Sequence, residues 1–154
     1  IRKYNDSDGM EYFISFESED ERLIYGFIRL RLSKTSGSNF FDELKNTALI
    51  RELHVYGQLI PTYSKERKKD IQHSGLGTKL IILAEKISVN NGYKSIAVIA
   101  GIGTRNYYRK FGYKKTKYGY LKKNLSKYDF KIILLLLSIG VIIFGVFFKI
   151  YLKN

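Results

Sequence analysis

The sequence predicts one domain of the α/β (α+β) class over residues 1–125, followed by a hydrophobic tail at 126–154. Three observations support this fold class. Two runs rich in aromatic and β-branched residues near the start of the chain are typical of a β-hairpin. A glycine-containing loop then leads into a segment with helical apolar periodicity. Further along, a short apolar run, a second helical segment and a polar-aromatic run alternate, so strands and helices share one fold.

The first half of the domain is expected to contribute three strands. Tyr12–Glu17 and Leu23–Leu32 form the predicted hairpin, and 33–39 is a polar loop without apolar periodicity. The third strand is Ala48–Tyr56, in which alternation separates two faces. One face is expected to carry Leu49, Arg51, Leu53 and Val55, and the other Ile50, Glu52, His54 and Tyr56. The charged stretch 57–70 is expected to be a loop, either solvated or in contact with nucleic-acid phosphates.

A helix is expected from the glycine loop to the stop signal Asn90-Asn91-Gly92. Its core-facing stripe comprises Leu76, Leu80, Leu83, Ala84 and Ile87. The loop before it lets backbone N–H groups at the helix start bind a phosphate, with the helix dipole favouring negative charge. The residues expected at this phosphate are Gln72, His73, Ser74, Gly75, Leu76, Gly77 and Thr78.

The remainder of the domain is expected to add two strands and a short helix. Lys94–Ala100 is continuously apolar after its start, which predicts a buried central strand. Thr104 is a suitable N-cap for a helix over 105–111. Tyr113–Leu121 is expected to be a polar-aromatic strand, broken at Gly119.

The composition narrows the classes of partner. Lysine and arginine number 27 against 14 acidic residues, a net charge of +13. This excess suggests nucleic acid, a CoA-type nucleotide or an anionic membrane, although a compositional bias towards Lys, Asn, Ile and Tyr explains it equally. The absence of cysteine excludes disulfides, iron–sulfur clusters and thiolate zinc sites within these residues, and two histidines predict no metal site.

The tail at 126–154 is expected to be a basic linker followed by a membrane anchor. Residues 132–148 carry no charge and are flanked by lysines, which is typical of a short transmembrane helix. A buried or partner-facing helix is the alternative, but such helices normally keep a polar stripe. We expect a tail anchor with a cytosolic domain, in the mitochondrial outer membrane rather than the endoplasmic reticulum. A fluorescent protein fused to 126–154 should then resist carbonate extraction, and a diffuse signal would refute the anchor.

Two motifs resemble a known family. Gln72–Gly77 fits the acetyl-CoA loop Q/R-x-x-G-x-G/A of the GNAT acetyltransferases, and Tyr108–Tyr113 fits their later Y-x-K-x-G-F/Y element. Arg51–Gly57 and Gly101–Lys110 resemble the acetyltransferase domain of the catalytic subunit of Elongator, a tRNA wobble-uridine modifying and histone acetyltransferase family. The resemblance extends from Arg2 to about Lys122.

The resemblance implies a GNAT acyl-CoA N-acyltransferase fold, with a mixed, mostly antiparallel sheet and flanking helices. It implies acetyl-CoA as cosubstrate, tRNA uridine (U34) C5 modification as function, and tRNA and other Elongator subunits as partners. The family's iron–sulfur cluster and S-adenosylmethionine belong to an upstream radical-SAM domain that is not in these residues, so we expect a C-terminal fragment. Alternatives are a protein lysine (histone) N-acetyltransferase and a membrane-tethered acetyl-CoA-binding module without catalysis.

The resemblance also implies residue roles. The strand Leu53-His54-Val55 should diverge from its neighbour at Ser95–Ala100 so that pantetheine inserts, with the Val55 N–H as oxyanion donor. Tyr108 is the position of the general acid, and Tyr107 beside it packs or shapes the pocket. Contacts with acetyl-CoA are expected from Leu53, His54, Val55, the loop Gln72–Thr78, Asn106 and Tyr108.

Other polar residues near this site have two interpretations. Glu52 and His54 share a strand face, so either is a candidate to activate an amine or a water. The alternative is that Glu52 forms an ion pair and that His54 is a hydrogen-bonded structural residue. Arg105, Arg109 and Lys110 flank the short helix and are either solvated or bind phosphates of CoA or tRNA.

Overall fold

The computed structural model describes residues 1–6, 8–36, 40–56 and 75–126. The segment Ile1–Asn124 forms one compact unit. Its elements are β1 (Arg2–Asp6), β2 (Gly9–Glu17), β3 (Ile24–Leu32), η1 (Asp42–Leu44), β4 (Ala48–Val55), α1 (Leu76–Asn90), β5 (Ser95–Val98), η3 (Ile102–Thr104), α2 (Arg105–Arg109), β6 (Lys114–Lys115) and β7 (Leu121–Asn124).

Three expected features lie outside the described residues: the loop at 57–70, the loop residues 72–74 and the membrane span at 132–148. Among the described residues, no helix is long and apolar enough to cross a membrane.

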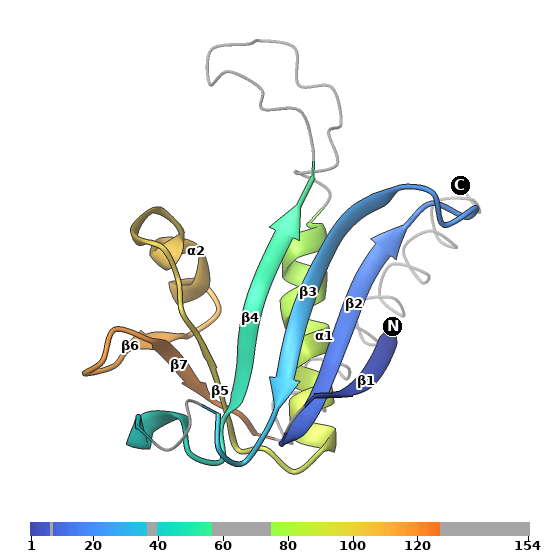
Figure 1. Cartoon of the computed structure of the whole chain (residues 1–154). Helices are drawn as coiled ribbons and strands as arrows, with labels where there is room; N and C mark the ends of the chain where they lie inside the picture. The colour runs from blue at the N-terminus through green and yellow to red at the C-terminus, as the bar shows by residue number, and fades with distance from the viewer. Residues whose placement is uncertain (7, 37–39, 57–74, 127–154) are drawn as a thin grey trace, which may run out of the picture. The chain divides into compact units, whose positions relative to one another are not determined.

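The strands form one sheet in the order β1-β2-β3-β4-β5-β7-β6 (Figure 1). Strands β4 and β5 are parallel, and the other neighbouring pairs are antiparallel. This confirms the expected mixed, mostly antiparallel sheet and the hairpin β2–β3. The sequence does not predict β1, because its five residues Arg-Lys-Tyr-Asn-Asp show no apolar alternation. The strand is held instead through its backbone pairing with β2 at the sheet edge.

Helix α1 covers one face of the sheet and lies behind β3 and β4 in Figure 1. It begins after Gly75, whose backbone is left-handed with φ 71°, and ends before Gly92, with φ 86°. Glycine adopts these dihedrals without the steric cost that a Cβ adds. Both predicted ends of the helix are therefore confirmed.

The buried stripe of α1 differs from the predicted one. Leu80 and Ala84 are buried as expected, but Leu76, Leu83 and Ile87 are only half-buried. The additional buried positions are Gly77, Ile81, Glu85, Ser88 and Val89. Polar residues can occupy this face because they have partners there. The Ser88 hydroxyl donates to the Ala84 carbonyl at 2.8 Å, and Lys123 Nζ lies 2.8 Å from a Glu85 carboxylate oxygen.

A β-bulge changes the expected faces of β4. Arg29 pairs with Glu52 and Leu30 with Ile50, so Arg51 is an extra residue between two pairs. Ile50 is fully buried, whereas the Arg51 guanidinium reaches the open face of the sheet. The expected grouping of Ile50 with Glu52 and His54, and of Arg51 with Leu53 and Val55, is therefore wrong.

Two expectations for the C-terminal part of the domain also need correction. The single strand expected at 113–121 is a hairpin, β6–β7, with the turn at Gly119 (φ 92°), so only the position of the break was right. Thr104 makes no side-chain capping bond to α2. Its hydroxyl donates instead to the Gly101 carbonyl at 3.0 Å, because residues 102–104 already form the 3-10 turn η3.

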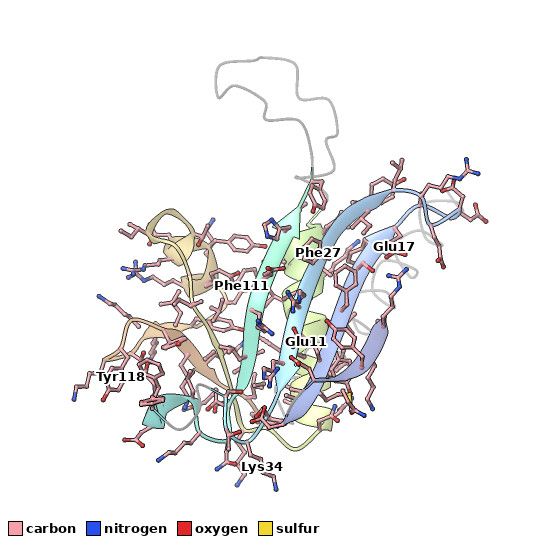
Figure 2. The ribbon with its side chains drawn as sticks, in the orientation of Figure 1. Glu11, Glu17, Phe27, Lys34, Phe111 and Tyr118 are labelled. Atoms are coloured by element: carbon pink, nitrogen blue, oxygen red, sulfur yellow. The ribbon has the colours of Figure 1, made fainter. Side chains whose placement is uncertain are left out.

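The face of β1–β4 opposite α1 carries a buried charge cluster, and Figure 1 shows no described helix across it. Glu11 is fully buried there, with its carboxylate oxygens 2.9 Å from Arg29, 3.3 Å from Arg51 and 3.6 Å from Arg31. Figure 2 shows Glu11 and Phe27 on this face. Because buried carboxylates need charged or hydrogen-bonding partners, Glu11 ties the guanidinium groups of β3 and of the β4 bulge to β2.

Candidate functional site

The sheet splits where β4 and β5 diverge, and we call this split between the two strands the cleft. Their parallel pairing covers only Ala48–Ile50 against Ile96–Val98. Strand β4 continues to Val55, five residues beyond the last of these pairs, while it stays paired with β3. The divergence expected between Leu53-His54-Val55 and the strand at 95–100 is therefore present.

The alternation of the antiparallel ladder determines which backbone groups face the cleft. The Tyr56 N–H, just after β4, donates to the Tyr25 carbonyl of β3 at 2.9 Å. Backbone groups of an antiparallel strand point alternately to its two sides. The N–H and C=O of Val55 and Leu53 therefore point away from β3, towards the cleft, and those of His54 point towards β3. Of the three predicted cofactor-binding residues on β4, Leu53 and Val55 present their backbone to the cleft.

The start of α1 meets the end of β4 and helix α2. Gly77 is buried, and a Cβ at this position would overlap the Tyr107 hydroxyl and lie 3.5 Å from Val55 Cγ2. Within the described residues, no side chain caps the N-terminus of α1. Its first-turn N–H groups are therefore available to an anion. Leu76 and Thr78 beside Gly77 are half-buried, and the other expected loop residues, Gln72, His73 and Ser74, lie outside the described chain.

The two tyrosines of α2 occupy different environments. Tyr108 is buried, with its ring edge-on to Tyr107 at 5.7 Å and to Tyr113 at 5.8 Å between centroids. Burial, and secondarily the proximity of Tyr107, raises the pKa of Tyr108 to about 12. Tyr107 is half-buried, and its hydroxyl lies against Gly77. Tyr107 therefore places its phenol at the start of α1, and the buried Tyr108 beside it keeps its proton at any physiological pH.

Glu52 and His54 lie on the open face of the sheet, as their shared face predicts. The Glu52 carboxylate lies 3.7 Å from the Arg29 guanidinium, the ion pair named as one alternative. His54 is exposed, and its ring stacks on Phe27 at 5.1 Å and on Tyr56 at 6.4 Å between centroids. This ring packing is a structural contact of His54, and the hydrogen bond of the alternative interpretation stays a prediction.

The remaining predicted contact, Asn106, is exposed on α2 and accepts a hydrogen bond from Arg109 Nη1 at 2.7 Å. Arg105 Nε donates to the Ala100 carbonyl at 3.5 Å. These contacts hold α2 against the end of the β5 segment. They leave the Asn106 amide nitrogen as a group that a ligand can reach.

Sequence reasoning missed a buried cluster beneath Tyr108. It joins Tyr113 to the Glu85–Lys123 pair, and both Tyr113 and Glu85 are buried. Burial, followed by the negative charge of Glu85, raises the pKa of Tyr113 well above its usual value. Glu85 lies one helical turn after the buried Ile81, so helical periodicity could have indicated that Glu85 faces the core. Lys123 stands in a basic run and offers no such signal.

The chain is similar to known proteins in sequence and in fold. No protein-family model matches the chain. Elongator complex protein 3 of Danio rerio is 42% identical over 126 residues, which cover 80% of this chain and 22% of that protein. The solved structure of Elp3 from Methanocaldococcus infernus is 37% identical with a TM-score of 0.68, covering 80% of this chain and 29% of that one. A GNAT-family acetyltransferase from Staphylococcus aureus is 15% identical with a TM-score of 0.52, covering 78% and 70%.

The fold and these similarities define the class: the described unit has the fold of the GNAT acetyltransferases. Within that class, the matched residues belong to the Elongator complex protein 3 family. The chain spans about a fifth of the length of the curated relatives it matches.

The contact between Gly77 and Tyr107 can be tested by a double-mutant cycle. Gly77→Ala should destabilise the fold by about 1 kcal/mol, because the new methyl group meets the Tyr107 hydroxyl. Tyr107→Phe removes that oxygen, so the double variant should recover most of the loss, giving a coupling energy of about 1 kcal/mol. Urea unfolding of the four proteins measures it. Additive losses would show that the two residues do not touch.

Proposed function

We propose that this domain binds acetyl-CoA and transfers its acetyl group to an acceptor. The observation that carries the proposal is the convergence of three features at one cleft. These are the unpaired edge of β4 beyond Ile50, the uncapped start of α1, and the two tyrosines of α2. Each feature alone has a structural explanation, and their meeting at Gly77 is what favours a ligand site.

The residues present fit the cosubstrate. Gly77 has no side chain to cover the first turn of α1, and its close packing against Tyr107 excludes one, so the backbone N–H groups of this turn can approach a phosphate closely. The backbone groups of Leu53 and Val55 suit an extended amide-containing chain, which pairs with them as a neighbouring strand would. Acetyl-CoA supplies an activated acetyl group as a thioester. The Val55 N–H is placed to stabilise negative charge on the acetyl oxygen.

The raised pKa of Tyr108 decides how that residue acts. An ordinary thiol has a pKa of about 8.5, well below the value of about 12 for Tyr108. Full proton transfer from Tyr108 to a departing thiolate is therefore uphill. Tyr108 stabilises the thiolate by donating a hydrogen bond, and Tyr107, nearer the helix start, is placed to do the same.

The acceptor and the partner proteins are inferred from the family resemblance. The similarity to Elongator complex protein 3 supports a role in tRNA wobble-uridine modification, together with Elongator subunits and an upstream radical-SAM domain holding an iron–sulfur cluster and S-adenosylmethionine. Half-buried Glu52 and exposed His54 lie on the open sheet face, and either can contact an acceptor there. A protein lysine is the alternative acceptor, and stimulation of acetyl-CoA turnover by tRNA but not by a lysine peptide would favour the tRNA role.

The tail at 126–154 supports a membrane-bound location, with the fluorescent-protein fusion to these residues as its test.

Binding and catalysis can be separated by two variants. Titration calorimetry should detect acetyl-CoA binding to the full chain, and Gly77→Glu should abolish it, because the new carboxylate displaces Tyr107 and repels a phosphate at the first turn of α1. Tyr108→Phe should leave binding intact and lower kcat by about 10- to 100-fold. With a pKa of about 12, Tyr108 should cause no loss of turnover between pH 8 and about 10. Absence of acetyl-CoA binding would refute the function, and full activity of Tyr108→Phe would refute the role of that tyrosine.

A further inference from the structure

Helix α2 is too short to hold Tyr108 in place by itself. It contains five residues, Arg105–Arg109, and isolated helices of fewer than about 12 residues are marginal in water. The position of Tyr108 therefore depends on the side chains that pack around it. Ring contacts come from Tyr107 within the helix and from Tyr113 outside it, the latter at 5.8 Å between centroids.

Tyr113 is joined to Tyr108 by its backbone as well as by its ring. The Tyr113 N–H donates to the Tyr108 carbonyl at 3.4 Å, after Gly112 turns the chain with φ 86°. Tyr113 is only 1% exposed, so its ring has no space to move unless its neighbours move. The contacts that fix the Tyr113 ring therefore also restrict the Tyr108 ring.

Two charged residues from distant elements pack against Tyr113. Lys123 on β7 places its ammonium group 5.9 Å from the centroid of the Tyr113 ring, within range of a cation–π contact. The same Nζ lies 2.8 Å from Oε2 of Glu85 on α1. The pKa of Tyr113 is raised first by burial and then by the negative charge of Glu85, because this carboxylate lies near the phenol. Tyr113 thus has a positive and a negative group beside it.

Stability alone does not account for this ion pair. The Glu85 side chain is 6% exposed, and neither its Oε1 nor the Tyr113 hydroxyl has a hydrogen-bond partner within the part of the chain that the structure describes. Unpartnered buried polar atoms cost free energy, and apolar residues in place of a buried ion pair are often neutral or stabilising. An apolar residue at position 85 would continue the buried face that Ile81 and Ala84 form. The arrangement around Tyr113 therefore suggests a role beyond stability.

We propose that this ion pair is a positioning device for Tyr108: it holds the Tyr113 ring, and that ring aims the Tyr108 hydroxyl at the departing thiolate. Glu85 and Lys123 are thus positioning residues that act through Tyr113. A displacement of about 1 Å near a reacting group can lower a rate about 100-fold, so a small shift of the Tyr113 ring is enough to slow turnover. This inference rests on the proposed function of Tyr108, whereas the packing of the two rings can be measured without it.

The test removes the pair and asks whether the loss depends on the Tyr108 hydroxyl. Glu85→Leu/Lys123→Met replaces both charges with apolar side chains, so neither charge is left buried alone. The matched control, Ser88→Ala/Thr116→Val, removes side-chain hydrogen bonds from the same elements, α1 and the β6–β7 hairpin, without changing a charge. Each pair of changes is made in the full chain with and without Tyr108→Phe. Urea unfolding, acetyl-CoA calorimetry and acetyl-CoA turnover in the presence of tRNA are measured for every protein.

Glu85→Leu/Lys123→Met should lower kcat about tenfold and change the Kd for acetyl-CoA less than about twofold. In the Tyr108→Phe background the same changes should lower kcat by no more than about twofold, because no hydroxyl is left to misplace. The control variant should keep the kcat of the unaltered protein. A tenfold loss that persists in Tyr108→Phe, or an unchanged kcat, would overturn the proposal. If urea unfolding shows that the first variant is not folded, Glu85→Gln/Lys123→Met, which keeps the size of both side chains, is measured with the same expectation.

Ring packing gives a readout that needs no turnover. With isotope-labelled tyrosine, the nuclear magnetic resonance signals of the Tyr108 ring should shift and broaden in Glu85→Leu/Lys123→Met, because Tyr113 no longer fixes that ring. They should stay unchanged in the control variant. Unchanged Tyr108 signals without the ion pair would overturn the proposal. If acetyl-CoA does not bind while these signals shift as expected, the proposed function falls and the dependence of the Tyr108 ring on the ion pair stands.

Discussion

The early end of the β4–β5 pairing is the constraint on which the candidate site depends. Two parallel strands that stay paired satisfy each other's backbone groups and leave no edge for a ligand. Here the pairing stops at Ile50, next to the bulge at Arg51. The Arg51 guanidinium is tied to buried Glu11 on the open face, so β4 remains attached to β3 and β2 while it leaves β5. The cleft is thus a split in the strand pairing of the sheet itself.

Electrostatics divides the domain into two regions with different roles. The acidic residues Asp6, Glu11 and Glu52 neutralise the arginines of the β1–β4 face, so that face is held together by internal pairing. The segment from α2 to β7 has no acidic residue of its own, and of its eight cationic side chains only Lys123 forms an ion pair within the described residues. Between them stands a pair of tyrosines, of which Tyr108 stays protonated because burial raises its pKa to about 12. A neutral donor beside a positively charged surface suits chemistry on a polyanionic acceptor.

Periodicity and glycine signals predicted most of the fold, because they act locally. The hairpin β2–β3, the ends of α1 at Gly75 and Gly92, and the buried strand β5 follow from such signals. The bulge at Arg51 and the edge strand β1 could not be predicted, because they depend on pairing with distant residues. For the site, motif resemblance indicated Gly77, Tyr107 and Tyr108. The overlap of Gly77 with Tyr107 and the burial of Glu85 against Lys123 arise only when the elements pack.

Amide hydrogen exchange at β4 tests the central claim most directly. If Leu53 and Val55 face an open cleft, their N–H groups should exchange rapidly in the free protein and become protected when acetyl-CoA is added. The N–H groups of His54 and Tyr56, which face β3, should be protected in both states. Equal protection of all four amides without acetyl-CoA, or no change at Leu53 and Val55 when it is added, would contradict the account.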